Sequence, residues 1–195
     1  MPRIIGGSLV EHREETRRRL FAALARLMED RGFDAVTLAE VAAEAGVGRT
    51  AVYNHVPDKE TLLVEYIAHE TAGWLAGLEA ALAEAADPVA RLRVYVRHQL
   101  EMRRSFHMPA GLRAALSPEG QVRLREHAAP VEAVLREILA DGMASGAFVT
   151  QPLDVVVGLV NACVTARVAV GRAGDRETPA ATEAFVLRAV GATGT

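Results

Sequence analysis

The chain has 195 residues, half of them hydrophobic and only 5% aromatic, with a formal net charge of −3. This length allows one large or two small domains, and the composition favours close-packed helices over a β-sandwich. A single cysteine, Cys163, excludes an internal disulfide and favours a reducing compartment. The first residues lack the apolar stretch of a signal peptide, so we expect a cytoplasmic protein.

The negative charge argues superficially against nucleic acid as a partner. Residues 1–60 carry nine Arg or Lys against ten Asp or Glu. Affinity depends on local charge placement more than on the sum, so a DNA-binding function is not excluded.

The N-terminus predicts an arm followed by a helix. Residues 1–10 read as a flexible tail, with Arg3 as a candidate minor-groove contact. An apolar stripe then predicts a helix from about Glu11 to Arg31, ended by Gly32. Arg17 and Arg18 on this helix either approach phosphates or belong to a solvated face.

Residues 37–56 predict two short helices joined by a tight turn. Thr37 and Glu40 have the spacing of a capping box, and Gly46 supplies the left-handed residue that ends the first helix. The second helix begins at Gly48 or Arg49 and stops by Val56, because a proline follows.

The second short helix predicts a nucleic-acid surface. With Val52 turned inward, polar side chains remain outside, namely Arg49, Thr50, Tyr53, Asn54 and His55. Arg and Asn can bond base edges bidentately, and hydroxyl or imidazole groups can bond phosphates. The alternative is the solvated face of an ordinary helical hairpin.

Further helices are predicted by their start signals. A long helix begins at the Asp58 cap and reaches roughly Ala86, and Asp87-Pro88 begins the next. We expect a short helix over Pro109–Leu116 and another from Ser117-Pro118, with Pro130 causing a kink or a new start.

Residues 153–170 form the most apolar stretch, and Thr178-Pro179 begins a final helix. Asp154, Asn161 and Arg167 make the stretch a poor membrane span, so we predict a buried helix and no membrane partner. Small residues every four positions and one aromatic on the last helix predict a dimer interface, with Gly158, Ala162, Ala166 and Phe185 in contact. Completion of a monomer core is the alternative.

The run A-G-V-G-R-T-A-V-Y-N-H-V-P-D-K-E-T-L-L, residues 45–63, resembles the DNA-binding signature of TetR/AcrR-type transcriptional regulators. Gly48 stands where Ser is usual and Val56 where Phe is usual. The resemblance implies a homodimer that binds double-stranded, pseudo-palindromic operator DNA, with recognition helices about 34–36 Å apart or a near multiple. It also implies that the last two helices pair with their two-fold mates, and that a ligand swings the helix beginning at Asp58.

We therefore predict an all-α protein of nine or ten helices. Residues 1–57 would form a three-helix helix-turn-helix head, and residues 58–195 a helical regulatory and dimerisation domain. Arg49, Thr50, Ala51 and Asn54 would face bases, while phosphates would be held by Thr37, Tyr53, His55 and Lys59.

The second domain is expected to bind an unidentified small-molecule effector between its helices. The candidate lining residues are polar or aromatic groups on apolar helices, namely Trp74, Tyr95, Gln99, Met102, Phe106, Asn161 and Arg167. No enzyme motif, cofactor or metal site is expected, because the chain has no nucleophile elbow, H-E-x-x-H or phosphate loop. The predicted function is a ligand-responsive repressor; the alternative is a DNA-binding dimer regulated through a protein partner.

Overall fold

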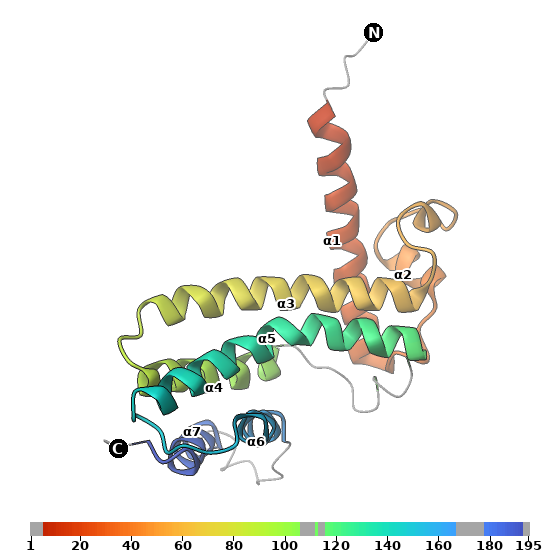
Figure 1. Ribbon diagram of the computed structural model, residues 1–195. Coiled ribbons are helices and arrows are strands. Elements are labelled where there is room, and N and C mark those ends of the chain that lie inside the picture. Colours follow the sequence, from red (N-terminus) through yellow and green to blue (C-terminus); the bar gives the residue numbers. More distant parts are fainter. Residues whose placement is uncertain (1–5, 106–111, 113–115, 167–177, 193–195) are drawn as a thin grey trace. The chain divides into compact units, whose positions relative to one another are not determined.

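The computed structural model describes residues 6–105, 112, 116–166 and 178–192, and these are helical with no strand among them (Figure 1). The seven α-helices are α1 (Gly6–Arg31), α2 (Leu38–Glu44), α3 (Lys59–Ala83), α4 (Pro88–Ser105), α5 (Pro118–Ala144), α6 (Leu153–Thr165) and α7 (Thr178–Ala189). A short 3-10 helix, η1, spans Ala51–Asn54. The predicted all-α class is confirmed, whereas nine or ten helices is wrong for the described residues.

The lower count has local causes. Pro130 lies inside α5 without starting a new helix, although a proline there removes one backbone hydrogen bond. The short helix expected over Pro109–Leu116 falls largely outside the described residues. At the N-terminus α1 begins at Gly6, so the expected arm over residues 1–10 is replaced by helix from that position.

Three predicted helix starts are confirmed by their cap hydrogen bonds. Thr61 N donates to Asp58 Oδ1 at 2.7 Å, and Ala90 N donates to Asp87 Oδ1 at 2.8 Å. Gly120 N donates to the hydroxyl of Ser117 at 3.1 Å. Each bond satisfies a backbone donor that the first turn leaves without an intrahelical partner. The end of α3 at Ala83 falls three residues before the expected Ala86.

The chain divides into two compact units. The first comprises residues 1–70 and 108–127, and the second comprises residues 71–107 and 128–195. Both α3 and α5 contribute residues to each unit. The predicted boundary between the helix-turn-helix head, residues 1–57, and the regulatory domain, residues 58–195, concerns function and stays a prediction.

The first unit has its own core, in which α1 packs against α2 and α2 packs against η1. Its fully buried side chains are aliphatic and come from α1, α2, η1 and α3, including Leu20, Leu24, Val41, Val52, Leu62 and Leu63. Burying such a side chain contributes about 1.5–3 kcal/mol. This core fixes the frame on which the polar side chains of the unit are carried.

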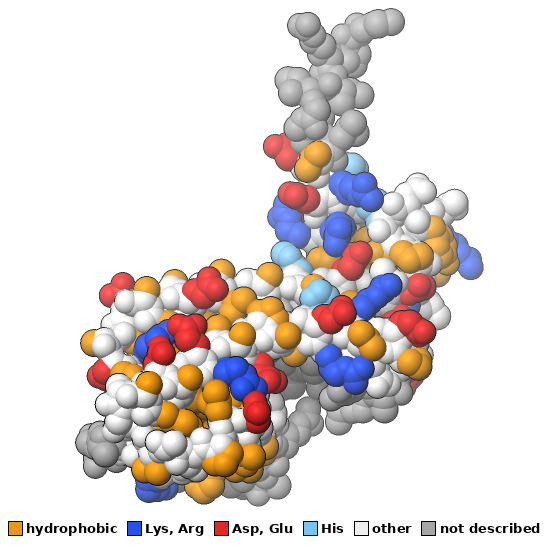
Figure 2. Space-filling view, viewed as in Figure 1, with side chains coloured by type: hydrophobic (Ala, Val, Ile, Leu, Met, Phe, Trp, Pro, Cys, Tyr) orange, Lys and Arg blue, Asp and Glu red, His pale blue; other side chains and the backbone are white. Residues whose placement is uncertain are grey.

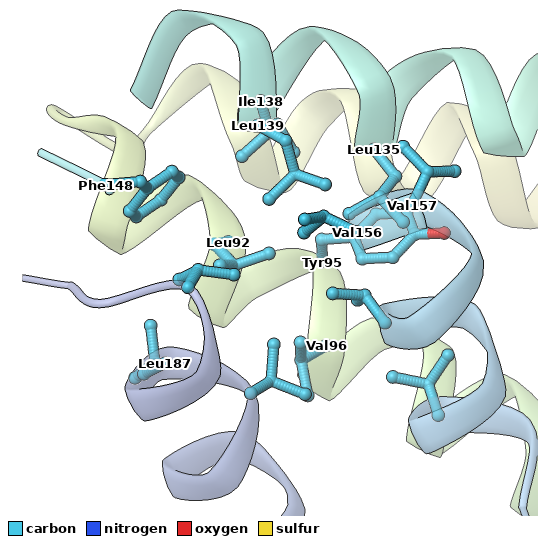
Figure 3. Close-up of a cluster of buried hydrophobic side chains, with 14 of the residues drawn as sticks. Leu92, Tyr95, Val96, Leu135, Ile138, Leu139, Phe148, Val156, Val157 and Leu187 are labelled. Carbon is cyan, nitrogen blue, oxygen red and sulfur yellow. The ribbon is translucent and has the colours of Figure 1, made fainter. Parts of the chain in front are cut away.

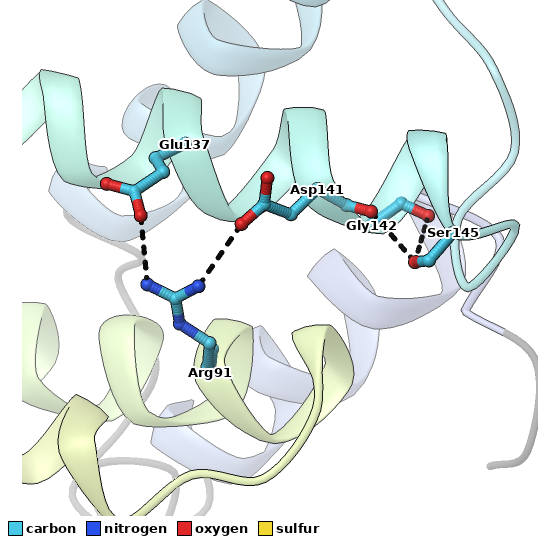
Figure 4. Close-up of polar contacts among 5 residues, drawn as sticks. All are labelled: Arg91, Glu137, Asp141, Gly142 and Ser145. Atoms are coloured by element: carbon cyan, nitrogen blue, oxygen red, sulfur yellow. Dashed lines mark hydrogen bonds and ion pairs between the residues drawn. The ribbon is translucent and has the colours of Figure 1, made fainter.

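The second unit is built around α4, which packs against α6 and α7. Figure 3 shows aliphatic side chains of α4, α5, α6 and α7 in one cluster with Tyr95, which is fully buried. At the edge, Arg91 on α4 bonds Glu137 at 3.4 Å and Asp141 at 3.3 Å on α5 (Figure 4). These exposed acids make the ion pairs weak, so apolar packing holds the unit together.

The apolar segment near the C-terminus has two different faces. Helix α6 ends at Thr165, earlier than the expected continuation to residue 170, because Ala166 adopts an extended backbone with ψ 135°. Its buried side is a row of valines, namely Val156, Val157, Val160 and Val164. Among the described residues, no helix has both the length and the apolar character to cross a membrane.

Candidate nucleic-acid interface

The turn that presents the candidate interface is fixed by two local devices. Thr37 N donates to Glu40 Oε2 at 2.8 Å and Glu40 N donates to the Thr37 hydroxyl at 3.2 Å, so the predicted capping box is confirmed. The Thr37 hydroxyl also donates to Glu40 Oε2 at 2.7 Å, and this bond, followed by those from Thr37 N and Arg31, lowers the pKa of Glu40 to about 2. At the other end Gly46 has φ +65°, and Val47 N reaches back to Ala42 O at 2.8 Å. This is the glycine-terminated helix end that the sequence predicts.

The expected second helix is shorter and tighter than predicted. Only Ala51–Asn54 form a helix, of the 3-10 type, although Thr50 and His55 on either side keep helical backbone angles. The segment contains both α-helical and 3-10 hydrogen bonds. Val52 N donates to Gly48 O, four residues back, and His55 N donates to Val52 O, three residues back. The glycine before the segment and the proline after it limit any helix here to residues 49–56.

The side chains of this segment divide into a buried group and an exposed group. Val52 and Val56 are buried, which confirms the inward side of the segment. The side chains on the other side are exposed, namely Arg49, Thr50, Ala51, Tyr53 and Asn54. Tyr53 is 57% exposed, so its ring and hydroxyl are accessible to a partner.

Two other candidate phosphate contacts, His55 and Lys59, are less free. His55 is half-buried, and its Nδ1 has no hydrogen-bond partner among the described residues. Burial, followed by the charges of Arg13, His12 and Arg17, holds the pKa of His55 below its ordinary value. The proximity of these groups places basic side chains of α1 beside η1.

Lys59 has a structural partner within the first unit. Its Nζ donates to Phe33 O at 2.8 Å and lies 4.2 Å from the centroid of the Phe33 ring. A lysine ammonium has three donors, so a phosphate contact remains compatible with this bond.

The arginines of α1 are partly neutralised within the first unit. Arg17 pairs with Glu65 at 2.9 Å, and Arg18 pairs with Glu15 at 2.6 Å. On the face shown in Figure 2, positive and negative side chains are interspersed. Any DNA contact from this chain therefore depends on a few placed cations and hydroxyls more than on a broad basic field.

Several residues predicted to line a pocket meet in the second unit. Gln99 Nε2 donates to the Tyr95 hydroxyl at 2.8 Å, and that hydroxyl donates to Asn161 Oδ1 at 3.3 Å. Burial raises the pKa of Tyr95 to about 12. Trp74 donates to His98 O at 3.2 Å, and Met102 is half-buried. The pocket residues Phe106 and Arg167 lie outside the described residues.

The residues predicted for a dimer interface are accessible within the second unit. Gly158, Ala162 and Ala166 are exposed, although Ala166 lies just beyond the end of α6. Leu159 on α6 is 61% exposed and Phe185 on α7 is 55% exposed. Together with Val155, these side chains leave apolar surface on the two last helices.

Sequence reasoning missed a buried carboxylate that joins α4 to α7. Glu183 accepts from Arg97 Nε at 2.5 Å and from Arg93 at 3.3 Å. The hydrogen bonds and charge of Glu183 raise the pKa of Arg97. The partners are separated by 86 and 90 positions, and nothing in the local sequence of α7 indicates them. Over the described ranges, no three His, Cys, Asp or Glu side chains are grouped to hold a metal ion.

Sequence comparison gives matches that cover part of the chain. Residues 20–66 match the profile of the family described as bacterial regulatory proteins, tetR family. An uncharacterized HTH-type transcriptional regulator of Mycobacterium bovis is 37% identical over 68 residues, which are 35% of this chain and 36% of that protein. The chain thus aligns with about a third of the length of its curated relatives.

Structure comparison extends the likeness to nearly the whole chain. A TetR/AcrR-family regulator of Thermobifida fusca has a TM-score of 0.73 and 18% identity, covering 88% of this chain and 96% of that one. FadR of Bacillus subtilis, solved with stearoyl-CoA, has a TM-score of 0.75 and 15% identity, covering 89% and 97%. At these identities the likeness concerns the fold.

Proposed function

Since residues 20–66 place this chain in the tetR family of bacterial regulatory proteins, we propose that it is a DNA-binding transcriptional regulator. The observation that carries the proposal is the outward surface of the segment from Arg49 to Asn54. That segment is fixed by a capped α2, by the Gly46 turn and by the buried Val52. A rigid frame with exposed Arg, hydroxyl and amide groups suits a major groove.

The side chains divide by the contacts that their chemistry supports. Arg49, Thr50, Ala51 and Asn54 face base edges in this proposal. Phosphates are bound by Thr37, Tyr53, His55 and Lys59. Base contacts would determine sequence preference, and phosphate contacts would make the affinity depend on salt.

We also propose that the regulator acts as a homodimer on a pseudo-palindromic operator. The exposed apolar side chains of α6 and α7, including Leu159 and Phe185, support this state because such surface is costly in a monomer. Gly158 and Ala162 allow close helix approach on the same surface. A regulator of this kind would act beside the bacterial chromosome, in the cytoplasm, without catalytic activity.

The proposal includes an effector that binds in the second unit and favours a second conformation, which would make the chain a ligand-responsive repressor. The Gln99–Tyr95–Asn161 hydrogen-bond chain supports it, because specific polar groups within an apolar core are typical of ligand sites. FadR shares the fold and was solved with stearoyl-CoA, so long-chain acyl-CoAs belong in a thermal-shift panel. A dimer regulated through a protein partner, the second candidate, would show no shift with any small molecule.

The experiment that tests DNA binding is fluorescence anisotropy against sequences selected by the protein from a random duplex pool. We expect tight binding that weakens steeply with salt. Arg49→Ala should relax preference at one base pair, by about 1–3 kcal/mol of discrimination. Tyr53→Phe and Lys59→Ala should weaken all sequences alike. Failure to select any sequence would overturn the proposal.

A further inference from the structure

The first turn of α5 is bonded by a carboxylate that comes from α3. Ser117 N donates to Glu60 Oε2 at 3.2 Å, and the Ser117 hydroxyl donates to Glu60 Oε1 at 2.5 Å. The Ser117 oxygen also accepts from Gly120 N at 3.1 Å. A negative charge at the positive end of a helix is favourable, so this contact stabilises both partners. Residues 57 positions apart are thereby joined within the first unit.

The close approach depends on a glycine. A Cβ atom added at Gly120 would overlap Oε1 of Glu60 and lie 2.9 Å from its Cδ. Real Cβ atoms do not approach that closely, so any side chain at position 120 displaces the carboxylate or the helix turn. Gly120 and Glu60 are therefore matched to each other.

Glu60 also follows directly on the DNA-facing segment. Asn54 ends η1, Val56 is buried, and Asp58 caps α3. The neighbouring Lys59 holds Phe33 O. The first turn of α3 is thus fixed on one side by Phe33 and on the other by the N-terminus of α5, through Glu60.

The surroundings of Glu60 allow the contact to open. The carboxylate is half-buried beside a cavity of about 420 Å³ lined by charged groups, including Glu119 and Arg123. If the contact opens, water in this polar hollow can solvate the carboxylate, and Ser117 still caps α5 with its own oxygen. The states with the Glu60–Ser117 contact formed and broken therefore differ by a modest free energy. A contact that adjusts DNA affinity requires such a small difference.

We infer that Glu60 is a positioning residue for DNA binding: its bonds to the first turn of α5 hold the first turn of α3, and thereby the segment from Arg49 to Asn54, in the binding geometry. The inference rests on the proposed function. It assigns to Glu60 an effect on affinity without any contact to DNA.

The test is a double-mutant cycle with Glu60→Ala, Gly120→Ala and both together, measured by anisotropy on the selected DNA. Each single variant should raise Kd about three- to tenfold, and the double variant should be no worse than Glu60→Ala. The added Cβ then meets no carboxylate, so Gly120→Ala should raise the unfolding midpoint in the Glu60→Ala background. The salt slope should stay unchanged, because phosphate contacts are not removed.

Glu119→Ala is the matched control, since it removes a carboxylate from the first turn of α5, which Glu60 contacts, and Glu119 lines the same cavity. It should leave Kd unchanged, while Glu60→Gln, which keeps one acceptor oxygen, should fall between wild type and Glu60→Ala. Titrating the active fraction of each variant separates lower affinity from partial unfolding.

Additive effects of the two substitutions on Kd would overturn the inference, as would wild-type Kd in Glu60→Ala or an equal loss in Glu119→Ala. A wild-type protein that selects no DNA overturns the proposed function instead, and the inference falls with it.

Discussion

In the first unit the proposed recognition side chains are exposed above a buried core. In the second unit the candidate ligand-site side chains lie inward and bond one another. Arg49, Tyr53 and Asn54 are exposed, and Val52 beneath them is buried. Tyr95, by contrast, is fully buried and bonded to Gln99 and Asn161. A partner can therefore meet the first unit without rearrangement, while a ligand in the second must exchange existing hydrogen bonds for its own.

The largest expected effect comes from the core that encloses Tyr95. Leu135→Ala removes a fully buried side chain from it and should lower the free energy of unfolding by about 2–5 kcal/mol. Trp74, the only tryptophan, belongs to the second unit, so urea unfolding followed by its fluorescence measures this loss directly. Val149→Ala, at an exposed position outside the proposed dimer surface, is the control. Equal losses in both variants would contradict the packing described here.

The second largest loss of stability is expected at the buried carboxylate of Glu183, which bonds Arg93 and Arg97. Glu183 is only 10% exposed, and Glu183→Gln weakens its bonds to two arginines, at a cost of about 1–3 kcal/mol in unfolding free energy. Glu137→Gln, which weakens the exposed Arg91 pair, should cost under about 1 kcal/mol. Chemical denaturation of the two variants side by side checks the order. A reversed order would mean that surface charge, and not burial, governs this unit.

Removing the central hydroxyl tests whether the inward groups depend on one another. Tyr95→Phe leaves Gln99 and Asn161 without their shared partner and should cost about 1 kcal/mol at neutral pH.

The same variant should change the alkaline limb of the stability curve. The pKa of Tyr95 is raised from 10.0 to about 12, so the folded state keeps its proton where the unfolded state loses it. The stabilisation is complete below pH 10 and is lost as pH rises towards 12, by up to about 1.4 kcal/mol per unit. In urea titrations the free energy of unfolding of Tyr95→Phe should fall less than that of the wild type between pH 10 and 12. Parallel curves for the two proteins would show that folding does not raise the pKa of Tyr95.

The smallest expected effect is a gain. Gly73 lies inside α3, and an added Cβ there meets nothing within 4 Å. Gly73→Ala should stabilise the helix by up to about 1 kcal/mol. Ala76→Gly, at an exposed position one turn later, should lose a similar amount. Thermal unfolding of the pair measures both signs, and a loss in Gly73→Ala would reveal a required contact at that position.

Signals between close neighbours made much of the fold predictable. The capping box at Thr37 and Glu40, the Asp58 cap and the Gly46 turn each involve residues within a few positions, so the sequence displays them directly. The inward Val52 followed from helical spacing. The 3-10 geometry of η1 did not, because periodicity over so few residues cannot distinguish the two helix types.

Contacts between distant residues could not be predicted. Glu183 meets Arg97, and Glu60 meets Ser117, across 86 and 57 positions. Nothing in the local pattern of either acid names its partner, since both look like ordinary charged positions on a helix. Pro130 predicted a kink or a new start, and the structure keeps it inside α5, because the local sequence alone does not show whether a helix continues past a proline.

The amine of Lys59, which bonds Phe33 O, can be modified selectively. Lys59 is the only lysine in the sequence, so a reagent that acylates amines can modify one side chain and the terminal amine. Acylation removes the positive charge that holds Phe33 O, next to the segment proposed to face DNA. The rate of labelling at this single amine therefore reports, without any substitution, whether the segment is free or engaged.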